Sequence, residues 1–256
     1  MTMNKTYTIL NYGCQMNESD SEHYAGQLSD LGYHYTEDFH EADVILINTC
    51  CVRESAEKKI LGKIGEMKAV KAKDPHKVLC VTGCMAQKDG EDFLKTYPQV
   101  DLLIGTAHVN NFKVILQEYL AEKNRKAGIY NDLTIMPQEF EGHFVRKSEY
   151  AAWVPIMYGC NNFCTYCIVP YVRGRERSRS AEAICEEIRK AVALGYREFT
   201  LLGQNVNSYG KDRGEANAFA QLLRQVDRIP GVERVRYMTS HPRDMSEELI
   251  KAVAES

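Results

Sequence analysis

Apolar and polar positions alternate along the first half of the chain in blocks that predict strands followed by helices. Residues 43–48 and 77–83 are short, nearly continuous apolar runs, which is typical of strands buried on both faces of a parallel sheet. Longer stretches with helical periodicity separate such runs. The predicted strands are 7–12, 43–48, 77–83 and 100–105, and the predicted helices are 19–31, 55–71, 91–97 and 110–123. This alternation predicts an α/β fold, a doubly wound parallel sheet.

Residues 131–147 lose this periodicity and collect polar side chains, which predicts a linker after a first domain of residues 1–130. The alternation then restarts with strands 150–156, 197–202 and 232–239 and helices 181–194, 216–227 and 246–254. Ser180 is the predicted N-cap of the first of these helices. Three strand–helix units are the beginning of a β/α barrel, which needs eight units. We therefore expect the second domain, residues 148–256, to be incomplete at its C-terminal end.

Composition narrows the class of protein. With 44% hydrophobic and 26% charged residues among 256, the chain has enough apolar material for a real core. A formal net charge of −3 gives no global basic field of the kind that indicates nucleic-acid binding. We find no apolar run long enough to cross a membrane and no signal peptide at the start, so we expect a cytoplasmic protein. Nine cysteines in a reducing compartment favour metal ligation over disulfides.

Three of these cysteines, Cys160, Cys164 and Cys167, follow a predicted strand at the spacing C-x3-C-x2-C. No fourth Cys or His is close enough in sequence to complete the four-ligand set of structural zinc. Three thiolates would instead fix three irons of a cubane cluster and leave the fourth open to an outside ligand. A structural or zinc-binding cysteine set is the alternative. A basic run follows the loop and either binds an anion or is simply solvated: Arg173, Arg175, Arg177 and Arg179.

This order of strand, cysteine loop and helix resembles the radical S-adenosylmethionine (SAM) superfamily. In that superfamily the open iron chelates the methionyl end of SAM, whose reductive cleavage yields a carbon-centred radical. The resemblance implies that the arginine run has a possible ligand in the carboxylate of SAM.

A second set of cysteines occupies matching places in the first domain. Cys14, Cys50 and Cys84 each follow one of three predicted strands. Because the carboxyl ends of parallel strands line one crevice, we expect these thiols to converge on a second three-cysteine site, chance placement being the alternative.

The other three cysteines are not predicted to be ligands. Cys80 and Cys185 fall inside a strand and a helix and are interpreted as small buried hydrophobes. Cys51 adjoins Cys50, and consecutive side chains in an extended segment point apart.

Several motifs together are similar to the methylthiotransferase family, and the similarity covers the whole chain. They are Asn-Tyr-Gly-Cys-Gln-Met-Asn at 11–17, Asn-Thr-Cys at 48–50, Gly-Cys-Met-Ala at 83–86 and the loop at 159–167. Residues 164–179 and 201–209 are most similar to the MiaB-type tRNA methylthiotransferases. The resemblance implies two [4Fe–4S] clusters and SAM as cofactors. The cluster that cleaves SAM would be held by Cys160, Cys164 and Cys167, and the auxiliary cluster that carries the sulfur would be held by Cys14, Cys50 and Cys84.

The same resemblance implies further contacts and partners. Tyr166 is expected by this resemblance at the SAM site. Gln204 and Asn205, at the end of the second strand of this domain, and Ser240, at the end of the third, are expected to face the same site because of their position. The implied enzyme is a transferase that adds a methylthio group to C2 of N6-isopentenyladenosine 37 in the anticodon loop of tRNA. It would need an electron donor such as flavodoxin or ferredoxin, and a sulfur donor. The chain departs from the family in lacking the remaining barrel strands and the RNA-binding TRAM domain.

Two alternatives stay open at this point. Sister branches of the family modify threonylcarbamoyladenosine 37 of tRNA or an aspartate of a ribosomal protein. A hypothesis from another functional class is that the chain is a non-catalytic, zinc-dependent nucleic-acid-binding module.

Overall fold

The computed structural model describes residues 5–51, 54–129, 133 and 144–255. The chain divides into two compact units, of which the first comprises Met1–Val145 with Tyr166–Arg173 and the second comprises Arg146–Thr165 with Gly174–Ser256. The predicted domain boundaries stay a prediction, because most of the predicted linker 131–147 lies outside the described residues. Tyr166–Arg173, on the C-terminal side of that linker, groups with the first unit.

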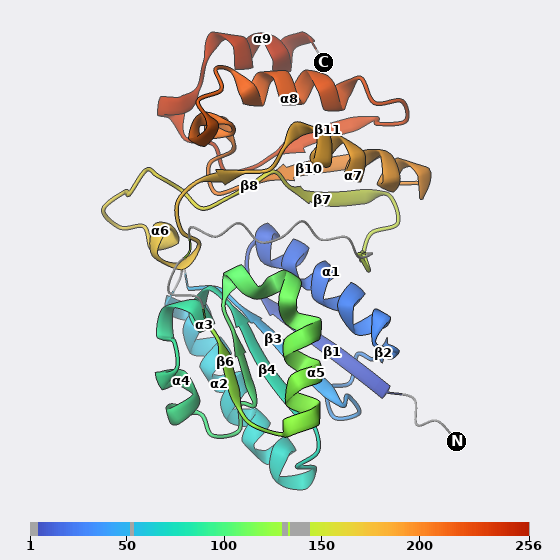
Figure 1. The fold of residues 1–256 in the computed structure, drawn as a ribbon, viewed down its shortest axis with the longest axis vertical. Coiled ribbons are helices and arrows are strands. Elements are labelled where there is room, and N and C mark those ends of the chain that lie inside the picture. The colour runs from blue at the N-terminus through green and yellow to red at the C-terminus, as the bar shows by residue number, and fades with distance from the viewer. Residues whose placement is uncertain (1–4, 52–53, 130–132, 134–143, 256) are drawn as a thin grey trace. The chain divides into compact units, whose positions relative to one another are not determined.

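The first unit is built on a six-stranded parallel sheet (Figure 1). Its strands are β1 (Lys5–Tyr12), β2 (Tyr33–Tyr35), β3 (Val44–Thr49), β4 (Val78–Gly83), β5 (Leu102–Ile104) and β6 (Lys126–Gly128). They are ordered β2-β1-β3-β4-β5-β6, and every pair is parallel. The strand order reverses between β1 and β3, and open α/β sheets bind ligands at such a switch point. The predicted doubly wound sheet is confirmed.

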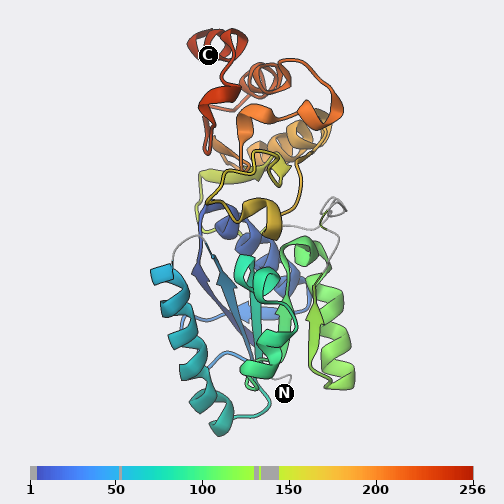
Figure 2. The ribbon, with the colours of Figure 1, turned by 90° about the vertical axis from the view of Figure 1, so that its left-hand side faces the viewer.

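Helices cover both faces of this sheet (Figure 2). They are α1 (Gln15–Asp30), α2 (Glu54–Lys73), α3 (Cys84–Asp89), α4 (Asp92–Thr96), the 3-10 helix η1 (Thr106–Asn111) and α5 (Phe112–Glu122). The short helix α6 (Val169–Val172) also belongs to this unit and packs against α3. Alternate residues of β3 point to opposite faces. Val44 and Leu46 pack with α1 and α5, whereas Ile45 and Ile47 pack with α2, which explains the continuous apolar run of this strand. The elements that the sequence pattern missed, β2, β6, α3 and α6, are all short.

The second unit has three parallel strands in the order β11-β10-β7. These are β7 (Ala151–Pro155), β10 (Glu198–Leu202) and β11 (Arg234–Tyr237), and they are accompanied by α7 (Ala181–Ala193), α8 (Ala218–Asp227) and α9 (Glu247–Glu255). Shorter elements are β8 (Met157–Tyr158) paired with β9 (Arg177–Ser178), and the 3-10 helices η2 (Val206–Ser208), η3 (Lys211–Arg213) and η4 (Pro242–Asp244).

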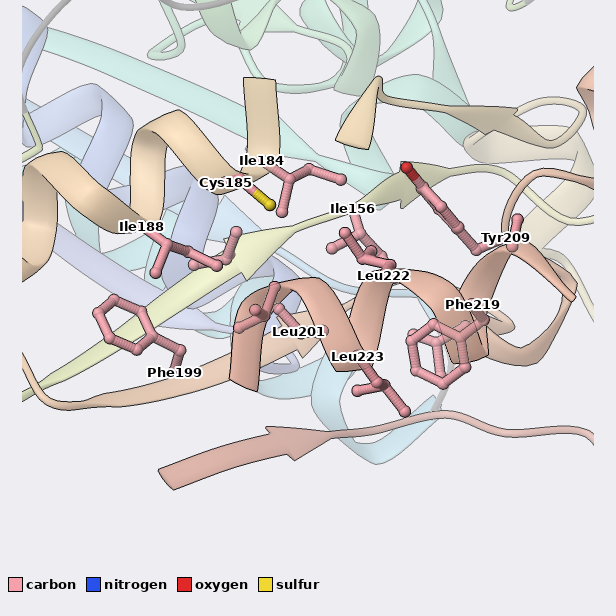
Figure 3. Close-up of a cluster of buried hydrophobic side chains, with 14 of the residues drawn as sticks. Ile156, Ile184, Cys185, Ile188, Phe199, Leu201, Tyr209, Phe219, Leu222 and Leu223 are labelled. Carbon is pink, nitrogen blue, oxygen red and sulfur yellow. The ribbon is translucent and has the colours of Figure 1, made fainter. Parts of the chain in front are cut away.

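Aliphatic and aromatic side chains from the strands, α7 and α8 form the core of the second unit (Figure 3). The predicted N-cap is confirmed, since the Ser180 hydroxyl accepts a hydrogen bond from the backbone N–H of Ala183 at 3.2 Å. Within the described part of the chain, no helix combines the length and the apolar character that a membrane span requires.

Candidate functional site

Three strand ends of the first unit bring Cys14, Cys50 and Cys84 to the same edge of the sheet. Tyr12 of β1 pairs with Thr49 of β3, which pairs with Gly83 of β4, so the three strands end level with one another. Cys14 is the N-cap of α1, Cys50 follows β3 directly, and Cys84 opens α3. The Cys50 thiol hydrogen-bonds Cys14, and Cys14 and Cys84 lie close enough for their charges to interact. The expected convergence of these thiols is therefore seen within the first unit.

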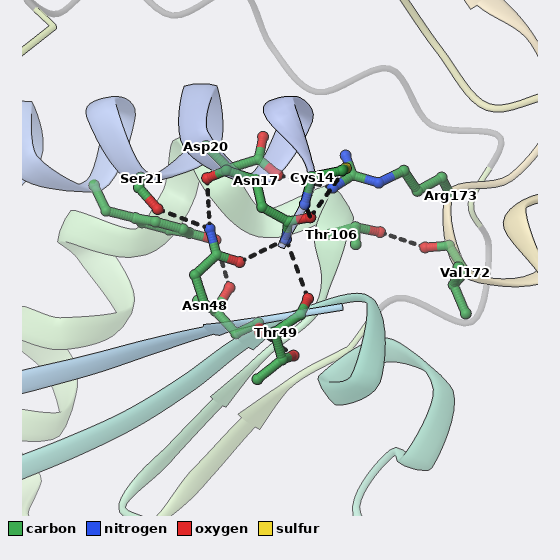
Figure 4. A network of polar contacts seen from close by, with 11 residues as sticks. Cys14, Asn17, Asp20, Ser21, Asn48, Thr49, Thr106, Val172 and Arg173 are labelled. Atoms are coloured by element: carbon green, nitrogen blue, oxygen red, sulfur yellow. Dashed lines mark hydrogen bonds and ion pairs between the residues drawn. The ribbon is translucent and has the colours of Figure 1, made fainter. Parts of the chain in front are cut away.

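Two buried asparagines fix the segments that carry Cys14 and Cys50 (Figure 4). The side-chain amide of Asn17 donates to Asn48 Oδ1 at 2.8 Å and to the Thr49 carbonyl at 3.1 Å. Asn48 Nδ2 donates in return to the Asn17 carbonyl at 2.8 Å and to Ser21 Oγ at 3.0 Å. Asn17 Oδ1 also accepts from the Cys14 backbone N–H at 3.3 Å. Both asparagines belong to the sequence motifs, but their role as a brace emerges only from the fold.

Gly83 sets the direction in which the chain enters α3 and Cys84. Its φ of 95° and ψ of −158° fall in a region that only glycine adopts readily. A Cβ here would lie 2.7 Å from Asn48 Oδ1 and nearer still to the Thr49 carbonyl oxygen. The close approach of β3 and β4 at their ends therefore requires a glycine immediately before this cysteine.

A buried arginine completes the cluster of thiols. Arg173, which caps the C-terminal end of α6, is only 5% exposed, and its Nη2 lies 2.9 Å from Oδ2 of the buried Asp20. The segment is held by a hydrogen bond from the Thr106 hydroxyl to the Val172 carbonyl at 2.6 Å (Figure 4). The sequence marked this arginine only as part of a basic run with an anion or with solvent as its partner. The structure pairs it instead with Asp20 and the thiols of the first unit.

The surroundings of these thiols favour their ionised forms. The hydrogen bond from Cys50 lowers the pKa of Cys14 to about 5, with the charge of Arg173 contributing against the opposing effect of burial. For Cys84, the hydrogen bond from the Cys51 thiol, followed by Arg173, lowers the pKa to about 7 although burial raises it. Thiolates are the form that binds iron.

The three other cysteines were predicted not to be ligands. The burial of Cys80 and Cys185 agrees with their interpretation as small hydrophobes, whereas the contact of Cys51 differs from the prediction. Cys80 is fully buried in β4 and Cys185 is 4% exposed in α7, as expected of small hydrophobes. Cys51 was expected to point away from the site, but its thiol donates a hydrogen bond to Cys84, which raises the pKa of Cys51. β3 ends at Thr49, so the alternation of an extended strand does not apply to Cys50 and Cys51.

The chemistry of the donor set limits the groups that this site could hold. Among the described residues, no three His, Cys, Asp or Glu side chains are arranged around a point suited to a single metal ion. Iron–sulfur clusters take cysteine thiolates as their ligands. The site supplies thiols, of which Cys14 and Cys84 have lowered pKa values beside a buried guanidinium, so the donor types fit such a cluster.

In the second unit, the loop after β8 carries Cys160. Gly159 has a φ of 75°, and a Cβ there would overlap the carbonyl oxygen of Arg175. The backbone N–H of Cys160 donates to the Gly174 carbonyl at 3.1 Å. The two sides of the loop are also joined by Asn161 and Glu176, each of which accepts from the other's backbone N–H, at 3.2 and 3.3 Å. These contacts hold Cys160 in a defined, buried position.

The other two cysteines of this loop are half-buried. Cys164 belongs to the second unit, whereas Cys167 lies in the segment Tyr166–Arg173 that groups with the first. The guanidinium of Arg175 stacks over Phe163 at 4.2 Å, and Arg179 pairs with Glu187 at 2.8 Å. Two of the four arginines of the basic run therefore have partners inside the second unit.

Comparison with known proteins finds matches in both units of the chain. Residues 6–105 match the model described as "Uncharacterized protein family UPF0004", and residues 154–256 match the radical SAM superfamily. The chain is 50% identical over 260 residues to the tRNA-2-methylthio-N(6)-dimethylallyladenosine synthase of Clostridium perfringens, and 52% identical over 258 residues to that of Clostridium novyi. Each alignment covers 98% of this chain. The chain is therefore similar, over nearly its whole length, to these two synthases.

These matches cover nearly all of this chain but only part of each relative. The chain spans 56% of the length of either clostridial relative. Among solved structures, it resembles the radical SAM methyltransferase TsrM from Kitasatospora setae, with a TM-score of 0.62 and 11% identity over 98% of this chain and 57% of that one. At this identity the likeness shows the fold alone.

The four remaining candidate residues have different surroundings. Asn205 is 1% exposed; its Nδ2 donates to Asp244 at 2.6 Å and its Oδ1 accepts from the His241 backbone N–H at 3.0 Å. Its amide therefore joins the loops after β10 and β11. The neighbouring Gln204 is half-buried, and Ser240 is exposed. Tyr166, in the first unit, is 90% exposed.

Proposed function

We propose that this chain carries the two cluster sites of an enzyme that adds a methylthio group to C2 of N6-isopentenyladenosine 37 in tRNA. The observation that carries the proposal is the convergence of Cys14, Cys50 and Cys84 beside Arg173, in a chain that also has a radical SAM loop. One cysteine site would suffice for SAM cleavage alone. A second thiol site indicates a second chemical step, and the names of the clostridial relatives point to methylthiolation as that step.

The target atom explains why two sites are needed. The C2–H of an adenine ring is neither acidic nor labile, so acid–base groups of the protein have no means of activating it. When bound, the clusters would supply reductive SAM cleavage to a carbon radical at one site and the sulfur to be transferred at the other. Cys160, Cys164 and Cys167 would hold the first cluster.

The residues of the chain would position these groups. Gly159 and the pair Asn161–Glu176 fix the loop of Cys160, and Asn17 with Asn48 fixes Cys14 and Cys50. Cys14, Cys50 and Cys84 would hold the auxiliary cluster. Around SAM we propose Tyr166, Gln204 and Ser240 as contacts. Asn205 would act by holding the loop in place, since its amide is bonded to Asp244.

The proposal includes partners and a place of action. The substrate would be the anticodon loop of tRNA, in the cytoplasm. Reduction would require an electron donor such as flavodoxin or ferredoxin, and repeated turnover would require a sulfur donor.

The direct test is metal content followed by product analysis. After anaerobic reconstitution, we expect about eight irons and about eight sulfides per chain. With SAM, a reductant and tRNA bearing isopentenyladenosine, mass spectrometry should detect the methylthio adduct. Zinc without sulfide would overturn the proposal. A product found only on threonylcarbamoyladenosine, or only on a ribosomal-protein aspartate, would move the chain to a sister branch.

Two substitutions separate the sites. Cys160→Ala should abolish SAM cleavage, whereas Cys14→Ala should spare cleavage and abolish sulfur insertion. Cys80→Ala removes a buried thiol away from both sites and serves as the matched control. Equal loss of SAM cleavage in the first two variants would refute this division of labour.

A further inference from the structure

The guanidinium of Arg173 is placed where a solvated arginine would not be. It is 5% exposed and lies against Asp20, whose side chain is 7% exposed. Burying a charged group is costly unless it is paired and hydrogen-bonded. A guanidinium has five N–H donors, and the Nη2 contact with Asp20 at 2.9 Å uses one of them.

Thiols are also among its neighbours. Arg173 hydrogen-bonds Cys84 and interacts through its charge with both Cys84 and Cys14. Figure 4 shows the guanidinium reaching the region of Cys14 and Asp20 at the start of α1. The support of this arginine is local, because α6 packs against α3, the helix that Cys84 opens. Arg173 is thus held at the thiol site by its own segment.

We propose that Arg173 is a positioning residue of the auxiliary site, which donates to the sulfur ligands and raises the reduction potential of the cluster held there. This inference rests on the proposed function for the presence of that cluster. Hydrogen bonds to cluster sulfurs and nearby charges set the potential, because a positive charge stabilises the reduced, more negative form. The burial of Arg173 leaves its field weakly screened by salt.

The pairing of Arg173 with Asp20 allows a stricter test, because the proposal predicts shifts of opposite sign in the reduction potential when each of these two residues is replaced. Removing the positive charge with Arg173→Gln should lower the potential. Removing the opposing negative charge with Asp20→Asn should raise it. A residue that merely supports the fold would not produce shifts of opposite sign.

The experiment is a redox titration of the auxiliary cluster, followed by electron paramagnetic resonance. The full chain carries Cys160→Ala, Cys164→Ala and Cys167→Ala, so that only the auxiliary cluster assembles. For Arg173→Gln we expect at least a tenfold fall in the ratio of reduced to oxidised cluster at fixed potential, or about 59 mV for a one-electron couple. Arg173→Lys keeps the charge and should stay near the parent. Arg175→Gln, at an exposed arginine of the same run, is the matched control and should not shift the potential.

The outcomes separate this inference from the function on which it rests. A parent that binds no iron and sulfide refutes both. A parent with a normal cluster, whose potential is unchanged in Arg173→Gln or shifts the same way in Arg173→Gln and Asp20→Asn, refutes the role of Arg173 alone. If Arg173→Gln fails to assemble the cluster, Asp20→Asn decides: a raised potential supports the proposal, and an unchanged or lowered one overturns it.

Discussion

Replacing Gly83 by alanine should destabilise the first unit more than any ordinary exposed substitution. A non-glycine residue at φ 95°, ψ −158° costs about 1–3 kcal/mol in backbone strain. The new Cβ would also lie 2.7 Å from Asn48 Oδ1 and closer to the Thr49 carbonyl, and overpacking of this kind costs about 1–3 kcal/mol more. The neighbouring carbonyl is part of β3 and cannot rotate away. We therefore expect a loss of about 2–6 kcal/mol of unfolding free energy.

Gly90, at the other end of α3, provides a matched control. Its φ of 61° and ψ of −156° are close to those of Gly83, but a Cβ there would meet nothing within 4 Å. Gly90→Ala should therefore lower the free energy of unfolding through backbone strain alone, by about 1–3 kcal/mol. The difference between the two variants isolates the cost of the close approach between β3 and β4.

Urea unfolding of the cluster-free protein measures both variants. Far-UV circular dichroism follows the whole chain, while the fluorescence of its single tryptophan, Trp153, follows the second unit. The Trp153 transition should keep its midpoint in Gly83→Ala. A loss in Gly83→Ala no larger than that in Gly90→Ala would refute the steric reasoning.

Three further predictions concern other contacts of the sites. In the cluster-free chain, the pH dependence of the alkylation rate of Cys14 should have its midpoint near pH 5, because the pKa of this thiol is lowered from 9.0 to about 5. Between these two pH values the folded state binds fewer protons than the unfolded state, so the free energy of unfolding should rise with pH. A midpoint near pH 9.0 would contradict a thiolate at Cys14. Asn17→Ala leaves buried acceptors unmet and should cost about 1–3 kcal/mol in urea unfolding, whereas a loss below that range would show that the brace is dispensable. Ser208→Ala removes a hydrogen bond of 2.7 Å to Glu176 and should lower the stability seen by Trp153 by about 1–3 kcal/mol, with no change expected in the first unit.

The strands and the convergence of thiols were predictable because both follow from local pattern plus one rule of topology. A continuous apolar run such as 43–48 signals a strand covered on both faces, and β3 is such a strand. The rule that parallel strands end together then places Cys14, Cys50 and Cys84 at one edge.

What could not be predicted depends on contacts between distant segments. The partner of Arg173 lies 153 positions away in the chain, and no periodicity relates it to Asp20. Cys51 lies beyond the end of β3 at Thr49, where the alternation of a strand no longer applies. Strands of three residues, such as β2 and β6, are too short to leave a pattern.

The passage of Tyr166–Arg173 into the first unit has a consequence for how the chain matures on the ribosome. Synthesis delivers Asp20 long before Arg173, so the nascent first unit holds the Asp20 carboxylate without its cation. Its sheet is complete once β6 has emerged, yet its interior charge balance is restored only when residue 173 follows. A recombinant piece that ends at residue 145 would remain in that earlier condition, because it lacks both the Arg173 guanidinium and the segment that carries it. A recombinant fragment of the first unit therefore has to include the segment Tyr166–Arg173, which packs with this unit although it is distant in sequence.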